Sequence, residues 1–209
     1  KTVILTDDLV DYPNTPTSIS EHDVDYVVVV DSVGDSSKIA SGAIRDTKNP
    51  RDILLAKTAC KVIVNSGYFR NGFSIQTGSG GASLAVVKYL RQSMIEQNVK
   101  ASFALGGITS HMVKLHKEGL IDHLIDVQSF DRVAAESLRD DPKHKEVSAN
   151  EYASPDEPGA ATKFLDIVIL SALEVDTNFN VNVLVGSDGI IRGAIGGHPD
   201  TAADSALSI

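Results

Sequence analysis

The sequence is poor in cysteine and in long apolar runs. Cys60 is the single cysteine of the 209 residues, so no disulfide can form within the chain, as is usual in reducing compartments. Apolar runs such as residues 167–170 are far shorter than the roughly 20 residues that a membrane-spanning helix needs. No signal-peptide pattern is present. These absences predict a cytoplasmic protein without a membrane partner.

Positive charge is also in deficit. The chain has 19 lysine and arginine residues against 28 aspartate and glutamate residues, which gives a formal net charge of −9. A nucleic-acid partner normally requires a basic face, and anionic membrane surfaces attract basic segments. The charge balance therefore argues against both kinds of partner.

Short β-branched runs alternate with helical patterns, which is typical of an α/β protein with an open, mostly parallel sheet flanked by helices. Most strand candidates are apolar without alternation, as expected where both faces of a sheet are covered. They are residues 3–5, 26–30, 62–65, 74–77, 102–105, 124–127, 166–170 and 181–184. The clearest helix follows Gly81, with an apolar stripe at Leu84, Val87, Leu90 and Met94. Shorter helices are predicted at residues 112–119 and 132–138.

Two stretches divide this pattern. Residues 46–52 separate two strand-rich parts, and Pro50 is a suitable first residue for a helix. Residues 140–162 are rich in charge, proline and glycine, and we expect a surface loop there.

The chain begins directly in a strand-like run and stops within an apolar stretch, so we interpret it as part of a longer polypeptide.

A glycine-rich loop, Gln-Thr-Gly-Ser-Gly-Gly-Ala-Ser, joins a strand to a helix at residues 76–83. Glycine lets the backbone approach a ligand closely, and the first N–H groups of a helix attract anions. Ser83 stands where a dinucleotide fingerprint has its third glycine, and no Gly-Lys-Ser/Thr follows as in a phosphate-binding P-loop. The spacing alone supports a ligand loop and a tight structural turn about equally.

Two further glycine sites have a similar composition. Residues 193–197 contain three glycines, with His198 and Asp200 beside them, although a hairpin turn would also use such glycines. Gly106 and Gly107 follow a predicted strand, and ligands of open α/β sheets lie at the carboxyl ends of strands. Three such sites in one chain predict a single pocket lined by backbone amides.

Polar side chains give weaker signals. Glu174 and Asp176 follow an apolar run; a turn explains Asp176 better, whereas Glu174 fits a turn and a site about equally. His111 follows a predicted strand end and is a candidate polar group, with a surface histidine as the more frequent alternative. The six histidines match no metal-ligand spacing, and Cys60 lies in an apolar stretch where we expect it to be buried.

Six longer phrases of the sequence resemble a known family. They are residues 64–69, 72–86, 103–109, 126–131, 170–176 and 186–209. The resemblance runs essentially from end to end and is to the α chains of bacterial citrate lyases, which are related to the wider CoA-transferases. It implies a CoA-transferase-like fold of two similar α/β halves. Residues 1–45 would close the first half, and residues 46–209 would supply most of the second.

The resemblance also implies an activity. Such α chains convert citrate and the acetyl thioester of an acyl carrier into the citryl thioester and acetate, and a separate β subunit then cleaves the citryl group. The thiol belongs to a CoA-derived prosthetic group on the small acyl-carrier γ subunit, and acetyl-CoA can substitute for it. The implied partners are therefore the β and γ subunits, citrate and acetate, in an oligomer. No cofactor is expected to be bound covalently to this chain, and no metal.

One departure from the CoA-transferases bears on mechanism. Many of them carry a catalytic glutamate after a strand, and the similar phrase here has His111 in its place. The resemblance to citrate lyase thus implies direct attack of a citrate carboxylate on the acetyl thioester, through a mixed anhydride. Such chemistry needs N–H donors at the developing oxyanion and cations that offset the charge of citrate.

Candidate roles follow from position. The predicted oxyanion donors are the backbone amides of Gly80, Gly81, Gly196 and Gly197. The predicted substrate-binding residues are Gly106, Gly107, His111, Glu174, Arg192 and His198. The CoA-derived arm would bind at Gly78, Ser79 and Gly193. Two alternatives stay open: a non-catalytic CoA-transferase-like binding module, and a CoA-transferase for another carboxylic acid.

Overall fold

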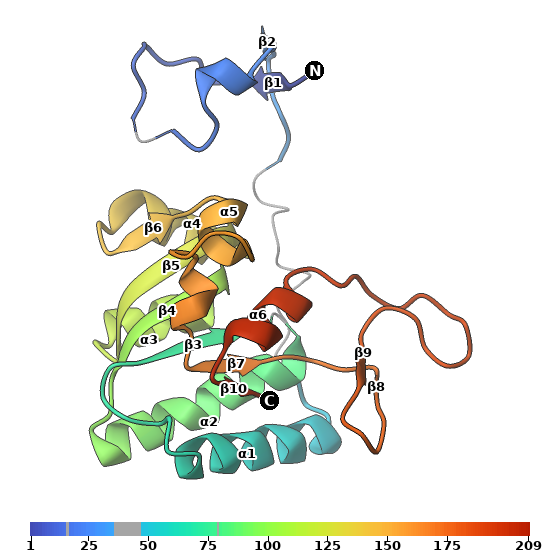
Figure 1. The fold of residues 1–209 in the computed structure, drawn as a ribbon. Coiled ribbons are helices and arrows are strands. Elements are labelled where there is room, and N and C mark those ends of the chain that lie inside the picture. The colour runs from blue at the N-terminus through green and yellow to red at the C-terminus, as the bar shows by residue number, and fades with distance from the viewer. Residues whose placement is uncertain (16, 36–46, 79) are drawn as a thin grey trace. The chain divides into compact units, whose positions relative to one another are not determined.

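The computed structural model describes residues 1–15, 17–35, 47–78 and 80–209 (Figure 1). The chain divides into two compact units, Lys1–Ile39 and Ala40–Ile209. The predicted division at residues 45 and 46 lies outside the described residues. The assignment of the two parts to the halves of a CoA-transferase-like fold stays a prediction.

The smaller unit contains a two-stranded parallel sheet. β1 (Val3–Thr6) pairs with β2 (Tyr26–Val29), and the 3-10 helix η1 (Glu21–Asp23) precedes the second strand. Both strands confirm the prediction made from their β-branched residues. Most of their apolar side chains are exposed, so the described part of this unit adds nothing to the buried core.

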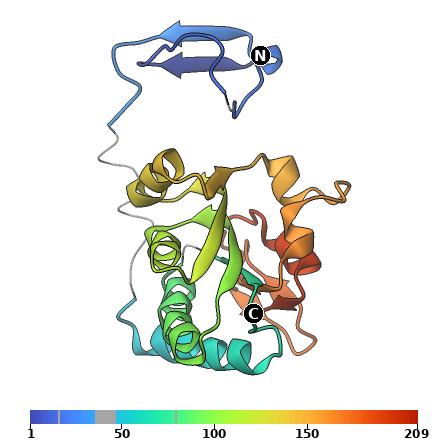
Figure 2. The ribbon, with the colours of Figure 1, turned by 90° about the vertical axis from the view of Figure 1, so that its left-hand side faces the viewer.

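The larger unit is built on a parallel sheet of six strands (Figures 1 and 2). The strand order is β10-β7-β3-β4-β5-β6, and every pairing is parallel. The strands are β3 (Phe73–Thr77), β4 (Ala101–Ile108), β5 (Ile121–Ser129), β6 (His144–Glu146), β7 (Ile167–Ile169) and β10 (Leu207–Ser208). All of β3 is buried because both faces of this central strand are covered. The predicted α/β class with a mostly parallel sheet is confirmed.

The main core lies between one face of the sheet and four helices. These are α1 (Pro50–Asn65), α2 (Gly81–Gln97), α3 (Ser110–Lys117) and α4 (Arg132–Asp140). Helix α2 buries Leu84, Val87, Leu90 and Met94, which confirms the predicted apolar stripe. Asp131 caps α4 through its side chain, and this helix begins at Arg132 as predicted. Helix α3 is also confirmed, but it begins and ends two residues before the predicted 112–119.

A second, smaller core lies on the opposite face of the sheet. Val168 packs there with Leu105 and Tyr152, whereas Ile167 belongs to the main core. Because neighbouring residues of a strand point to opposite faces, the two cores are separated by the sheet. Tyr152 comes from the short helix α5 (Ala149–Ala153).

The structure corrects the prediction of a surface loop at residues 140–162. This segment contains β6, α5 and the start of the 3-10 helix η3 (Ala161–Phe164). A capping box begins α5: Glu151 accepts from the Ser148 backbone N–H at 2.9 Å, and Ser148 Oγ accepts from the Glu151 N–H at 3.2 Å. Burial of Tyr152 then attaches this segment to the sheet.

The strand predicted at residues 62–65 is wrong. These residues form the last turn of α1, which begins at Pro50 as predicted and buries Ala56, Cys60 and Ile63 at helical spacing. A β-branched run favours a strand locally, but burial of one helix face outweighs that preference. The expected burial of Cys60 is confirmed.

An antiparallel hairpin and a short helix complete the larger unit. The hairpin pairs β8 (Glu174–Val175) with β9 (Val181–Asn182), so the strand predicted at residues 181–184 is shorter than expected. Helix α6 (His198–Asp204) leads into β10. Among the described residues, no helix is both long enough and apolar enough to cross a bilayer.

Candidate functional site

The strand order reverses beside β3. From β3 the chain adds β4, β5 and β6 on one side, and it later places β7 and β10 on the other. In open α/β sheets, ligands bind outside the carboxyl ends of the strands at such a reversal. A cavity of about 620 Å³ opens there, a size suited to a small-molecule ligand. Residues at the ends of four strands line it: Gln76, Gly107, Gln128 and Leu170.

The first glycine loop forms one wall of this cavity. Gly78 and Gly80 line it, whereas Gly81 begins α2 and Ser79 lies outside the described residues. A Cβ at Gly80 would lie 3.3 Å from Ser171 Oγ, so the loop passes close to the chain that follows β7. As the N-cap residue of α2, Gly80 has no side chain that could accept the first N–H groups of the helix. Those groups are therefore suited to a ligand oxygen.

The second glycine loop forms another wall. Its residues in the lining are Arg192, Gly193, Ala194, Gly196, Gly197 and His198. Gly196 has a φ of 50°, a conformation that favours glycine. A Cβ at Gly197 would lie 3.0 Å from Tyr152 Oη. The two loops that we expect to share one pocket thus do line one cavity, while the catalytic and binding roles of their residues stay predictions.

The glycine pair at the end of β4 makes room for protein side chains. Gly107 lines the cavity, and a Cβ there would lie 1.8 Å from Phe130 Cε2. Gly106 lies outside the lining and has a φ of 95°, and a Cβ there would lie 2.8 Å from Gln76 Cδ. The space beside each glycine is therefore filled by an aromatic ring or an amide.

The basic side chains Arg192 and His198 of the lining have protein partners. Arg192 Nη1 donates to Asp188 Oδ1 at 2.7 Å, and Nη2 donates to Oδ2. This pairing raises the pKa of Arg192 and lowers the pKa of Asp188. His198 Nδ1 lies 2.8 Å from the carbonyl oxygen of Ile195, and because a carbonyl only accepts, Nδ1 carries a proton. Arg192 therefore brings positive charge to the cavity as half of an ion pair, and His198 can present Nε2.

Two predicted substrate-binding side chains lie outside the described lining. His111 is in the first turn of α3. Glu174 is exposed in β8, and its Oε1 accepts from Ser187 N at 2.8 Å and from Ser187 Oγ at 2.7 Å. These hydrogen bonds lower the pKa of Glu174 and tie the hairpin to the turn at Ser187. Asp176 accepts from the Asn180 N–H at 2.9 Å and closes a turn, as predicted.

Two buried polar residues of the cavity carry no motif signal. Gln76 is 8% exposed and Tyr152 9% exposed, and Gln76 Nε2 donates to Tyr152 Oη at 2.6 Å. Burial is the main cause that raises the pKa of the Tyr152 phenol. Gln76 could not be recognised as a site residue because it lies in a phrase dominated by glycine. Tyr152 could not be recognised because it lies in a segment of loop-like composition. The Ser148 capping box is the signal that could place Tyr152 on a helix.

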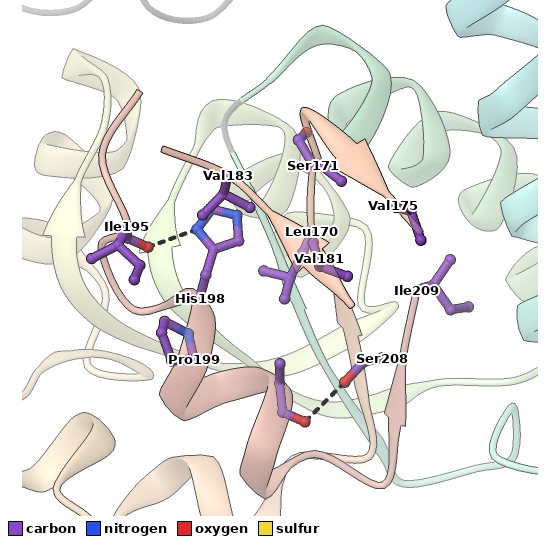
Figure 3. Close-up of a pocket in the computed structure, with 12 residues that line it drawn as sticks. Leu170, Ser171, Val175, Val181, Val183, Ile195, His198, Pro199, Ser208 and Ile209 are labelled. Atoms are coloured by element: carbon purple, nitrogen blue, oxygen red, sulfur yellow. Dashed lines mark hydrogen bonds between the residues drawn. The ribbon is translucent and has the colours of Figure 1, made fainter. Parts of the chain in front are cut away.

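A second cavity has a volume of about 360 Å³, and Figure 3 shows residues that line it. Its lining is mostly apolar and includes Val175, Val181, Val183 and Ile195. The two cavities share Leu170, Ser171 and His198. The imidazole of His198 therefore borders both cavities.

Comparison with known proteins gives matches along the whole chain. The family model "Citrate lyase, alpha subunit (CitF)" matches residues 1–209. The citrate lyase alpha chain of Escherichia coli (strain K12) is 59% identical over 207 residues, which are 99% of this chain and 41% of that protein. The citrate lyase alpha chain of Haemophilus influenzae is 58% identical over 209 residues, 100% of this chain and 42% of that protein. The chain thus spans about two fifths of the length of these relatives.

Comparison with solved structures also gives a citrate lyase alpha subunit. The crystal structure of the alpha subunit of citrate lyase from Streptococcus mutans, in complex with citrate, has a TM-score of 0.91 and 59% identity, over 99% of this chain and 41% of that one. A malonate decarboxylase alpha subunit from Acinetobacter baumannii has a TM-score of 0.67 at 17% identity, over 95% of this chain and 36% of that one, which is a likeness of fold alone. Since the family model covers the chain from end to end, the chain belongs to the family of citrate lyase α subunits.

Proposed function

We propose that the full-length protein containing this chain exchanges the acetyl group of a carrier thioester for citrate, as the transferase component of a citrate lyase. Membership of the α-subunit family supports a place in that complex. The citrate complex of the Streptococcus mutans relative supports citrate as the ligand. The observation that carries the proposal is the cavity of about 620 Å³ at the strand-order reversal, which both glycine loops line.

The exchange takes two acyl transfers. An ionised carboxylate of citrate attacks the acetyl carbonyl carbon, the C–S bond breaks, and a citryl–acetyl anhydride and a thiolate form. The thiolate then attacks the citryl carbonyl carbon of the anhydride, expels acetate and leaves the citryl thioester. No net proton transfer is required. The protein therefore acts mainly by placing the reacting groups and stabilising each oxyanion.

Backbone amides of the two glycine loops are the proposed oxyanion donors. Gly80, Gly196 and Gly197 lie in the lining of the cavity, and Gly81 begins the helix beside it. The N-terminus of α2 adds partial positive charge at the same wall. Loss of one such donor typically costs about 3 kcal/mol of transition-state stabilisation, so few well-placed amides are enough to matter.

Citrate binding requires compensation of its negative charge. Arg192 and His198 are the proposed contacts in the lining, with Gly107 beside them. Arg192 would share its charge between Asp188 and a citrate carboxylate. We assign Gly78, Gly193 and Ser79 to the thioester arm. Gly106, His111 and Glu174 stay predicted substrate-binding residues, although they lie outside the described lining of the cavity.

The thiol in this proposal belongs to a CoA-derived group on an acyl-carrier γ subunit, for which acetyl-CoA can substitute. A β subunit would cleave the citryl thioester in the same complex. Such an oligomeric assembly would work in the cytoplasm, with acetate as the released product.

The test is acetate release from acetyl-CoA by the full-length protein, with and without citrate. We expect release to depend on citrate. In a single turnover with citrate labelled by oxygen-18 in its carboxylates, direct attack transfers one labelled oxygen to acetate. An intermediate on an enzyme carboxylate would instead give unlabelled acetate in that first turnover. Acetate release at the same rate with and without citrate would refute the proposed function.

A further inference from the structure

Gln76 is a polar side chain at a position where the sheet is otherwise apolar. In the register of β3 it lies opposite Leu105 of β4 and Val168 of β7. Both neighbours are almost fully buried and belong to the smaller core. Packing alone favours an aliphatic residue between them, because a buried amide must find hydrogen-bond partners. Gln76 is nevertheless buried there and lines the cavity.

The amide of Gln76 is held in place by two contacts. Its Nε2 donates to Tyr152 Oη at 2.6 Å. The missing side chain of Gly106 leaves the space that the amide fills, since a Cβ there would lie 2.8 Å from Gln76 Cδ. Tyr152 itself lies against Gly197 of the second glycine loop. The amide is thus held in place by the protein before a ligand arrives.

The other polar atom of the amide has no partner. Gln76 Oε1 is buried and accepts no hydrogen bond from the described part of the chain. The hydroxyl oxygen of Thr77, which also lines the cavity, is likewise buried without a partner among the described residues. A buried acceptor without a donor is destabilising. Because Gln76 lies in the wall of the cavity, its Oε1 is placed to accept a hydrogen bond from a donor group on a ligand.

Ionised carboxylates cannot supply that donor, because they only accept hydrogen bonds. A hydroxyl group on the ligand can. We propose that Gln76 determines specificity for a hydroxy-polycarboxylate: the ligand hydroxyl donates to Gln76 Oε1, while the hydrogen bond to Tyr152 and the space beside Gly106 hold the amide in the cavity wall. This inference rests on the proposed function, since it takes citrate as the ligand of the cavity.

The experiment compares citrate with tricarballylate, which is citrate without its hydroxyl group. Titration calorimetry on the full-length protein gives the ratio of the two dissociation constants. We expect the wild type to prefer citrate by about tenfold or more, as in sites built to bind a substrate hydroxyl. In Gln76→Met, which keeps the length of the side chain but loses the amide, we expect the two affinities to become similar.

Two further variants sharpen the comparison. Gln92→Met is the matched control, because Gln92 is exposed on α2 and donates to Glu96 at 2.7 Å; it should keep the wild-type ratio. Gln76→Glu keeps an acceptor oxygen, so it should retain the preference for citrate. Its negative charge should lower the affinity for both acids. It also serves if thermal melting shows that Gln76→Met is unfolded.

The outcomes separate the inference from the proposed function. A wild type that binds both acids equally, or a folded Gln76→Met that keeps the wild-type preference, overturns the role of Gln76 and leaves citrate binding intact. Loss of the preference in Gln76→Glu overturns it as well. A wild type that binds neither acid refutes the proposed function itself.

Discussion

The ring of Phe130 occupies the place of a side chain at Gly107. A Cβ built at Gly107 would lie 1.8 Å from Phe130 Cε2 and 2.6 Å from Phe130 Cδ2, and both residues line the larger cavity. Any residue other than glycine must therefore displace the ring. Gly107 therefore helps to set the shape of the cavity, because it leaves the space that the Phe130 ring fills.

The first prediction follows from this contact. We expect Gly107→Ala to weaken citrate binding by about tenfold or more and to lower the melting temperature by several degrees, since overpacking typically costs about 1–3 kcal/mol. Calorimetry and thermal melting of the full-length protein measure the two effects. Gly159→Ala is the control, because a Cβ there has only an ordinary contact, 3.5 Å from Glu157 Oε1. Unchanged citrate affinity in Gly107→Ala would contradict the role of the ring.

Gly197→Val tests the proposed oxyanion wall. Gly197 has a φ of −83°, which any residue adopts, so the substitution changes the occupied space without straining the backbone. The new side chain would meet Tyr152 Oη, 3.0 Å from the Cβ position, and would enter the cavity. We expect at least ~100-fold loss of turnover, the scale of one lost oxyanion donor, with a melting temperature within a few degrees of wild type. Near-normal transfer by a folded variant would remove Gly197 from the site.

His111→Gln tests the absence of an enzyme nucleophile at that position. Since His111 lies in the first turn of α3, outside the described lining of the cavity, we expect substantial transferase activity to remain. Acetate release under saturating citrate measures it. A protein-bound thioester, trapped with hydroxylamine and mapped to this segment or to Glu174, would contradict direct attack by citrate.

Tyr152 links stability to alkaline pH. Burial favours the neutral phenol and raises its pKa in the folded state above the ordinary 10.0. The unfolded chain therefore releases this proton first as the pH rises. The stability that the group contributes is present below about pH 10 and is lost progressively above it. We expect the free energy of unfolding to fall more steeply with pH in the wild type than in Tyr152→Phe, measured by urea unfolding from about pH 8 to 11. Equal slopes would contradict the burial of a neutral phenol.

The helix α2 and the strand β3 could be predicted because local pattern and tertiary burial agree there. The stripe from Leu84 to Met94 is both a good helical face and the face that the sheet needs. Residues 62–65 could not be predicted, because their β-branched side chains favour a strand while the core requires the face with Cys60 and Ile63. Local preference and global packing disagree at that point.

The glycine walls of the cavity could be predicted from the sequence, as could Arg192 and His198, whereas Gln76 and Tyr152 could not. Glycine at a strand end is a local signal for close backbone approach. The pairing of Gln76 with Tyr152 depends on contacts between residues 76 positions apart, and no local pattern reports such a contact. The ion pair of Arg192 with Asp188, in contrast, joins residues only four positions apart.

The reversal of strand order beside β3 has a consequence for synthesis on the ribosome. Gln76 leaves the exit tunnel well before Tyr152, and Gly197 follows later still, because the chain emerges from its N-terminus. β7 pairs with β3 only after the strands on the other side of the sheet have been made, and β10 closes the edge last. The nascent chain can therefore form a partial sheet before the second glycine loop has been made. A chain interrupted after β6 would carry the first glycine loop without the second, and it would lack one wall of the cavity.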